Sequence, residues 1–201
     1  DGKPASPLTE RRITLGTTTT IVVLLMTLLV YALFCVVQFR FLFAGLFMNG
    51  SIALPDGLTY SDYARNGFFQ LLAVTAINLT IFAVALTFTP RPRSLTVSLI
   101  ALMTETAIML VSAALRLGLY IDAYGLTWLR YVSMTFIALL AVAILLCLVR
   151  LKVQRLPLIA TLVALFIVWY VALGFSNPYW ICETYNAFHG FDAAASVQPI
   201  R

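Results

Sequence analysis

The chain has 201 residues, of which 62% are hydrophobic and 10% are charged, and its mean hydropathy is +0.97. A soluble domain is about 45–50% apolar and about 25% charged. A soluble globular enzyme would therefore expose large apolar patches, and a disordered chain would contain far less apolar material, so both classes are excluded. The net charge is +5, but the basic residues stand at the ends of apolar runs, which argues against nucleic acid as a partner.

Five apolar runs follow one another along the chain, at residues 13–39, 60–88, 95–115, 126–149 and 156–175. A helix needs about 20 apolar residues to cross a bilayer, so each run is long enough. Arg40 and Arg116 close the first and third runs, and Asn177-Pro178 breaks the fifth. The runs lack the alternation of a β-barrel, and backbone groups in lipid must be satisfied within a helix. The predicted fold is an all-α polytopic bundle of five transmembrane helices.

The basic residues predict the orientation of this bundle. With five spans, eight basic and two acidic residues fall on one side, whereas five basic and five acidic residues fall on the other. The positive-inside rule then places the N-terminus in the cytoplasm of a bacterial cell, with the bundle in the plasma membrane. We expect a polar N-terminal segment at 1–12, the bundle at 13–175 and an extracytoplasmic tail at 176–201. The chain begins at Asp1 without an initiator Met, so we expect either that its start has been cut away or that it is a piece of a longer protein.

The sequence contains no pattern typical of catalysis or cofactor binding. Cys35, Cys147 and Cys182 have no paired spacing, so we expect free thiols in a packed apolar interior. His189 is the only histidine and lies in the tail, so haem or chlorophyll ligands are missing from the spans. There is also no Walker, HExxH or GxSxG motif. We expect no catalytic residue, no cofactor and no metal, and hence a protein that is not an enzyme.

Two of the polar residues inside the predicted spans form a candidate intramembrane site. Glu105 is near the middle of the third span and Asn78 is in the second. A charged carboxylate at mid-membrane costs about 2.5–3.5 kcal/mol on insertion scales, so Glu105 must face the bundle, be protonated or find a partner. One interpretation is a proton or cation site, and the other is hydrogen bonding between helices.

A second candidate site lies on the predicted outer face, where polar and aromatic residues flank the spans. One interpretation is a cluster that ties helices two, three and four together, with arginines pairing with Asp122 or Asp62. The alternative is that each arginine reaches lipid phosphates independently. The residues of this predicted outer cluster are Arg65, Arg116, Tyr120, Asp122, Tyr124 and Arg130.

Three stretches together resemble a known family. They are LPDGLTYSDYARNGFFQLLAVTAINL at 54–79, ALRLGLYIDAYGLTWLR at 114–130 and NPYWICETYN at 177–186. In this order they resemble the C-terminal membrane region of a bacterial multi-pass family, the domain of unknown function of the 4173 type. The resemblance implies further transmembrane helices ahead of this region, and it implies no catalytic residue or cofactor.

These observations lead to three functional hypotheses. The first is a non-enzymatic accessory or scaffold subunit, whose partners are the lipid bilayer and other membrane protein subunits. The second is a permease or ion-translocating protein that uses Glu105 with Asn78. The third is a membrane sensory domain that recognises a ligand at the outer arginine–tyrosine cluster.

Overall fold

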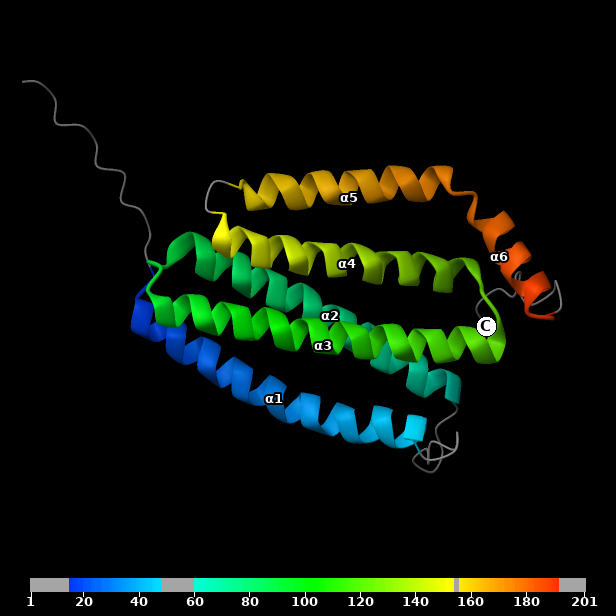
Figure 1. Cartoon of the computed structure of the whole chain (residues 1–201), viewed down its shortest axis with the longest axis horizontal. Coiled ribbons are helices and arrows are strands. Elements are labelled where there is room, and N and C mark those ends of the chain that lie inside the picture. Colours follow the sequence, from blue (N-terminus) through cyan, green and yellow to red (C-terminus); the bar gives the residue numbers. More distant parts are fainter. Residues whose placement is uncertain (1–14, 48–59, 154–155, 192–201) are drawn as a thin grey trace, which may run out of the picture.

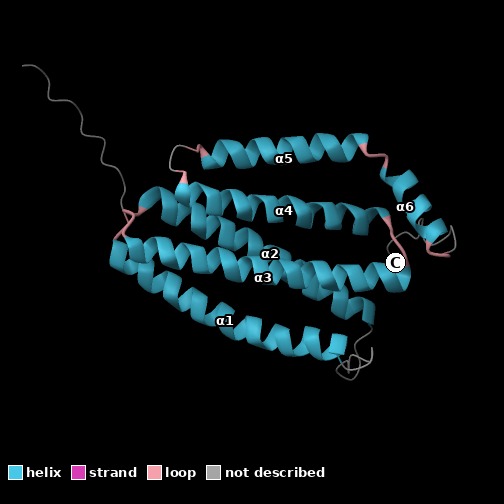
Figure 2. Ribbon diagram, in the orientation of Figure 1, coloured by secondary structure: helices cyan, strands magenta, loops and turns pink. Residues whose placement is uncertain are grey.

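The computed structural model describes residues 15–47, 60–153 and 156–191 of the chain, and every regular element in these ranges is a helix (Figure 2). The six helices are α1 (Thr17–Phe47), α2 (Tyr60–Phe88), α3 (Arg93–Tyr124), α4 (Trp128–Lys152), α5 (Leu158–Phe175) and α6 (Pro178–Phe188).

The first five helices are long and apolar enough to cross a membrane. Even the shortest of them, α5, has 18 residues, which at 1.5 Å per residue is about 27 Å and close to the hydrocarbon thickness. The predicted all-α bundle with five spans is confirmed. The protein is therefore a multi-pass membrane protein.

The five long helices run alternately up and down, and α3 lies at the centre of the bundle (Figure 1). α3 packs against α1, α2 and α4, and α5 packs against α4. We call the end that holds the α2–α3 connection the basic end, since Arg91, Arg93, Arg150 and Lys152 lie there. The opposite end, where α3 turns into α4 and α6 follows α5, we call the aromatic end.

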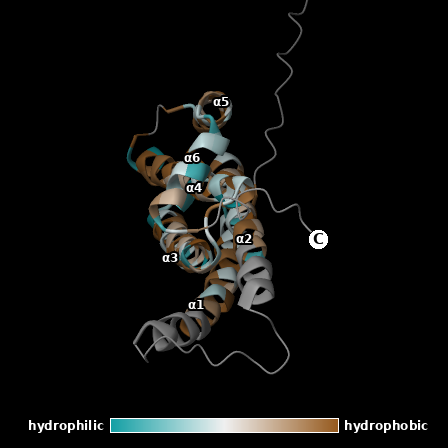
Figure 3. Ribbon diagram, turned by 90° about the vertical axis from the view of Figure 1, so that its right-hand side faces the viewer, coloured by the Kyte–Doolittle hydropathy of each residue, from teal (hydrophilic) through white to brown (hydrophobic). Residues whose placement is uncertain are grey.

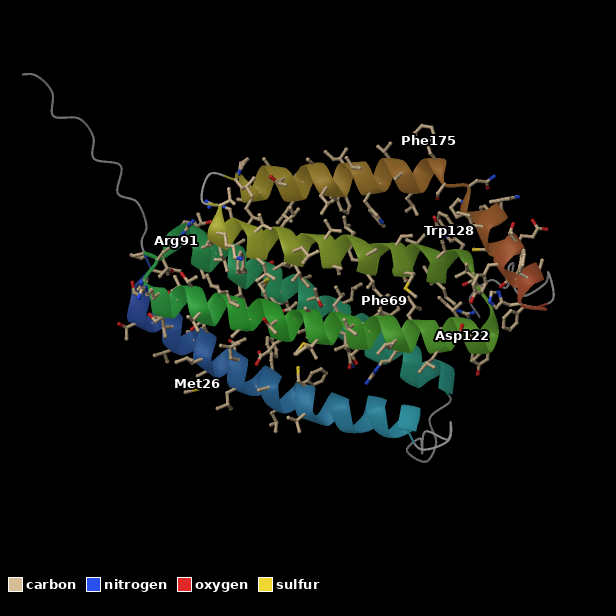
Figure 4. All side chains as sticks on the ribbon, viewed as in Figure 1. Met26, Phe69, Arg91, Asp122, Trp128 and Phe175 are labelled. Atoms are coloured by element: carbon tan, nitrogen blue, oxygen red, sulfur yellow. The ribbon has the colours of Figure 1, made fainter. Side chains whose placement is uncertain are left out.

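Apolar side chains fill the interior between α2 and α3, and they also cover much of the outside. Phe82, Leu95 and Leu102 are fully buried. Met26 on α1 and Phe175 on α5 point outward (Figure 4), and apolar colouring extends over the outer faces of the helices (Figure 3). An outer surface of this kind suits a hydrocarbon solvent, in which exposed apolar side chains carry no penalty.

Two helix ends differ from the predicted positions. α1 continues past Arg40 to Phe47, and α3 continues past Arg116 to Tyr124. An arginine marks the edge of an apolar run, but it is a good helix former and does not end a helix. α3 instead ends at Gly125, whose φ of 76° few other residues adopt readily.

A sixth helix, α6, occupies part of the predicted tail. Asn177 has a left-handed backbone with φ of 43°, and Pro178 occupies the first turn of α6. Proline favours this place because the first amide groups of a helix have no acceptor within it. The chain therefore turns sharply after α5 and lies across the aromatic end (Figure 1).

Candidate functional site

Asn78 lies at the buried interface between α2 and α3, with 0% of its surface exposed. Its Nδ2 donates a hydrogen bond of 2.9 Å to Oγ1 of Thr106 on α3. Thr106 in turn donates to the carbonyl oxygen of Leu102 at 2.6 Å. Oδ1 of Asn78 is also buried, and it has no hydrogen-bond partner within the described part of the chain. This residue therefore joins two helices and retains an unused acceptor.

Glu105 lies on α3 beside Thr106 but turns toward α1. Its side chain is half-buried, and it lies near the Tyr31 hydroxyl and the Cys35 thiol of α1. One carboxylate oxygen, Oε2, is buried with no hydrogen-bond partner among the described residues. No hydrogen bond joins Glu105 to Asn78 within those residues. The two predicted intramembrane residues therefore belong to different helix interfaces of α3.

Arg130 is the centre of the predicted outer cluster. Its guanidinium lies 4.0 Å from the ring centroid of Tyr120 and 5.9 Å from that of Tyr124. Nη1 of Arg130 donates to the carbonyl oxygen of Tyr124 at 3.0 Å and to that of Gly125. A cation at the C-terminus of a helix is stabilised by the unpaired carbonyl groups and by the helix dipole. Arg130 thus caps α3, and its charge is directed at backbone carbonyls.

The other members of the predicted outer cluster are distributed around this centre. Asp122 is exposed, and the partner of its Oδ1 is the Tyr185 hydroxyl, which donates from 3.5 Å. Arg116 is 7% exposed on α3, within the bundle. Arg65 belongs to α2, but its side chain lies outside the described residues. The structure therefore brings Tyr120, Tyr124 and Arg130 together and links Asp122 to α6.

Asn186, which the sequence analysis did not identify, fastens α6 to the turn between α3 and α4. Its Oδ1 accepts a hydrogen bond of 2.7 Å from the amide of Leu126, and its Nδ2 donates to the carbonyl oxygen of Leu126 at 2.9 Å. Asn186 is 1% exposed. The proline after Asn177 and the helical spacing of Pro178, Cys182 and Asn186 are the signals that could have predicted this buried face.

Gly125 makes this attachment possible. A Cβ at residue 125 would lie 2.9 Å from Oδ1 of Asn186 and 3.2 Å from Cγ of Phe191. Only glycine combines the positive φ of this turn with such a close approach. On the other side of the attachment, the rings of Trp128 and Tyr179 stack with centroids 5.9 Å apart and planes inclined by 6°.

The titratable groups of α6 respond to this packing. Partial burial raises the pKa of Tyr185, and the charge of Asp122 and the hydrogen bond to it raise the pKa further. Burial likewise raises the pKa of the Cys182 thiol. All three cysteines are free, as predicted. Within the described ranges, no group of three or more His, Cys, Asp or Glu residues is placed to hold a metal ion.

Comparison with known proteins places the chain in one family. The model described as Domain of unknown function (DUF4153) matches residues 2–193. The 4173-type family predicted from the three sequence stretches is not the one that matches. Tyr and Arg are common at helix ends in multi-pass proteins because they suit the membrane interface, so their presence there is weak evidence for one such family over another. No curated protein and no solved structure matches the chain.

Proposed function

We propose that this chain is a non-enzymatic accessory or scaffold subunit of a larger complex in a bacterial plasma membrane. The chain belongs to the family described as Domain of unknown function (DUF4153) and has five helices able to span a membrane. The positive-inside rule favours a cytoplasmic basic end and an outward-facing aromatic end.

Exposed aromatic residues at the aromatic end carry this proposal. We call four of them the aromatic platform: Trp128, Tyr179, Trp180 and Phe188, whose side chains are 40%, 69%, 63% and 88% exposed. The two hydrogen bonds of Asn186 fix α6 against the α3–α4 turn. Tyr and Trp are enriched at protein interfaces because they supply much contact area with few rotatable bonds. A surface that is already ordered loses little entropy when it binds.

The outermost helix supports the same interpretation. Among the residues of α5, which the structure describes throughout, only Leu158 is buried. α5 packs against α4, and its other sides carry large apolar residues such as Ile159, Val168 and Phe175. This helix therefore offers a long surface beside the aromatic platform on which a partner's transmembrane helix can pack.

The experiment is photo-crosslinking in native membranes. Trp180→benzoylphenylalanine places the probe on the aromatic platform, and Met26→benzoylphenylalanine is the matched control, because both side chains are 63% exposed. Met26 faces outward from α1 (Figure 4). We expect one discrete protein adduct from residue 180 and chiefly lipid adducts from residue 26.

A true partner must also co-purify with the wild-type chain in mild detergent and be lost from Trp180→Ala. A wild-type chain that leaves native membranes as a lone monomer contradicts the proposal. So does an adduct pattern at residue 180 that is the same as at residue 26.

Glu105 favours a second candidate function, an ion-translocating protein. The observation behind it is the buried Oε2, which has no hydrogen-bond partner among the described residues. A carboxyl group with an unused acceptor inside a membrane can take up a proton or a cation. Purified protein in liposomes would then show a proton- or cation-linked flux that Glu105→Gln abolishes and Glu183→Gln, on the exposed face of α6, preserves. An unchanged flux in Glu105→Gln eliminates this candidate.

A further inference from the structure

One side of α3 is left open by the other helices of the described chain. α3 packs against α1, α2 and α4, and no helix lies in front of it in Figure 1. Between residues 97 and 115, the exposed residues of α3 recur at intervals of three or four, so they line one side of the helix. We call this side the α3 ridge, and its residues are Val97, Ile100, Thr104, Ile108, Val111 and Leu115.

The α3 ridge is stiff and points away from α2. Thr106 bonds to Asn78 of α2, and Thr104, two residues earlier, lies about 200° from Thr106 around the helix axis. All residues of the ridge except Leu115 are β-branched, so their side chains have few rotamers to lose when another helix packs on them. Helices in lipid associate through such close packing, because lipid chains are as apolar as the side chains themselves. The ridge therefore suits the packing of a further helix.

Glu105 stands at the edge of the α3 ridge. It follows Thr104 and is therefore about 100° further around the helix, on the side that faces α1. Its side chain is half-buried, and its Oε2 is buried without a hydrogen-bond partner among the described residues. Carboxyl groups at this depth of a membrane are costly and are commonly paired with another polar or charged group.

The described spans supply no cation for this carboxyl group. The stretches 17–36, 69–88, 131–149 and 158–175 contain no Lys, Arg or His. On α3 itself, Arg116 is eleven residues beyond Glu105, which corresponds to about 16 Å along the axis. A complementary charge at the depth of Glu105 has to come from outside these stretches.

We propose that the α3 ridge and Glu105 form the docking surface for a transmembrane helix of a partner subunit, and that this helix carries an Arg or Lys at mid-membrane. The inference rests on the proposed subunit function and names the chemistry of the partner. The ridge supplies packing. The ion pair supplies selectivity, because a basic residue left unpaired at mid-membrane is itself costly.

Two synthetic transmembrane peptides of leucine and alanine test the docking surface, one with Arg and the other with Leu at the central position. Each is labelled for energy transfer to the purified full chain in liposomes. We expect the Arg peptide to bind the wild-type chain about tenfold more tightly than the Leu peptide, since a hydrogen bond to a charged group contributes at least that much. In Glu105→Gln the Arg peptide should bind no better than the Leu peptide.

Glu183→Gln is the matched control for charge, because it removes a carboxylate from the exposed side of α6 and should keep the preference for the Arg peptide. Ile108→Trp tests the ridge and should weaken binding of both peptides at least about fivefold through overpacking. Met26→Trp, on the outward side of α1 (Figure 4), is its control and should change binding no more than about twofold. Thermal midpoints recorded without peptide establish that all four variants fold.

Equal affinities of the wild-type chain for the two peptides would overturn the inference, as would equal losses in Glu105→Gln and Glu183→Gln. Equal effects of Ile108→Trp and Met26→Trp would place the peptide away from the α3 ridge and would also overturn it. A chain that co-purifies with a partner but shows no preference for the Arg peptide contradicts this inference alone. A chain that leaves native membranes as a lone monomer contradicts the proposed subunit function, whatever the peptides show.

Discussion

Two buried asparagines, Asn78 in the middle of the bundle and Asn186 at the aromatic end, each join parts of the chain that are distant in sequence. At Asn186 both halves of the amide are used, with bonds of 2.7 and 2.9 Å to the backbone of Leu126. At Asn78 only Nδ2 has a partner, Thr106, and Oδ1 is left without one among the described residues. The two sites contain the same side chain but differ in how completely its polar groups are satisfied.

This difference distinguishes the aromatic end, where a buried amide fastens two segments together, from the bundle interior, where polar groups remain able to form further hydrogen bonds. A fully satisfied buried amide rigidifies its surroundings, because any movement exposes a donor and an acceptor that lose their partners. In the bundle interior, acceptors on Asn78 and Glu105 have no hydrogen-bond partner among the residues that the structure describes. Such groups are costly in lipid, and in membrane proteins they are a reason to look for a transported ion or proton. We therefore assign stability to the aromatic end and assign the second candidate function to the interior.

The substitution Asn186→Ala should have the largest effect on this comparison. It removes two hydrogen bonds and leaves the buried amide and carbonyl of Leu126 unsatisfied, at about 1–3 kcal/mol for each group. We expect a loss of about 3 kcal/mol in the free energy of unfolding. Unfolding in mixed detergent micelles, followed by tryptophan fluorescence, measures the loss, and Trp180 on α6 should become more accessible to a soluble quencher. Thr184→Ala, on the exposed side of α6, is the control and should remain close to wild type.

The second substitution, Gly125→Ala, tests the same attachment of α6 at the glycine of the α3–α4 turn that Asn186 approaches. The positive φ and the Cβ position 2.9 Å from Oδ1 of Asn186 should together cost about 2 kcal/mol. Gly118→Ala is the matched control, because a Cβ at residue 118 of α3 meets nothing within 4 Å, and alanine inside a helix is neutral or stabilising. In a double-mutant cycle, Gly125→Ala should cost less in the Asn186→Ala background. Strict additivity of the two losses would show that Gly125 and Asn186 do not interact.

The third substitution, Asn78→Ala, applies the same change to the less satisfied asparagine. It removes one hydrogen bond between helices, which is worth about 1 kcal/mol in membrane proteins. Thr106 retains its bond to the carbonyl oxygen of Leu102. We expect a loss of about 1 kcal/mol in the same unfolding assay, with the exposed Thr80→Ala on α2 as the control. A loss as large as that of Asn186→Ala would contradict the inference that Asn186 stabilises the protein more than Asn78 does.

Hydropathy predicted the five spans because lipid requires about 20 apolar residues in a row, whatever their order. It misplaced the ends of α1 and α3 because an arginine interrupts an apolar run without interrupting a helix. The short turn between α3 and α4 allowed the grouping of Tyr120, Tyr124 and Arg130 to be predicted, since all three flank it in sequence.

The rest of the aromatic end could not be predicted from the sequence, because it depends on contacts between residues far apart in the chain. α6 has 11 residues of mixed polarity, too few to span a membrane and without a continuous apolar run. Asn186 and Leu126 are 60 residues apart, so no local pattern indicates that they meet. The sequence analysis grouped Glu105 and Asn78 because both are polar residues inside spans. Their positions on α3 and α2 instead direct them to different helix interfaces, which only the tertiary structure shows.

The smallest expected effect concerns Tyr185, which connects α6 to Asp122 on α3. Partial burial, the charge of Asp122 and the hydrogen bond to it raise the pKa of Tyr185 above its usual value near 10. A tyrosine with a raised folded-state pKa contributes stability that is complete below about pH 10 and is lost as the pH rises through the folded-state pKa. The stability difference between the wild-type chain and Tyr185→Phe should therefore be constant below pH 10 and shift in favour of Tyr185→Phe above it. Thermal unfolding across this range measures the shift.

In Asp122→Asn the shift should shrink, because burial alone then raises the pKa of Tyr185. A shift of the same size in Asp122→Asn would show that Asp122 on α3 does not affect the pKa of Tyr185 on α6. The attachment of α6 to the α3–α4 turn would then rest on Asn186.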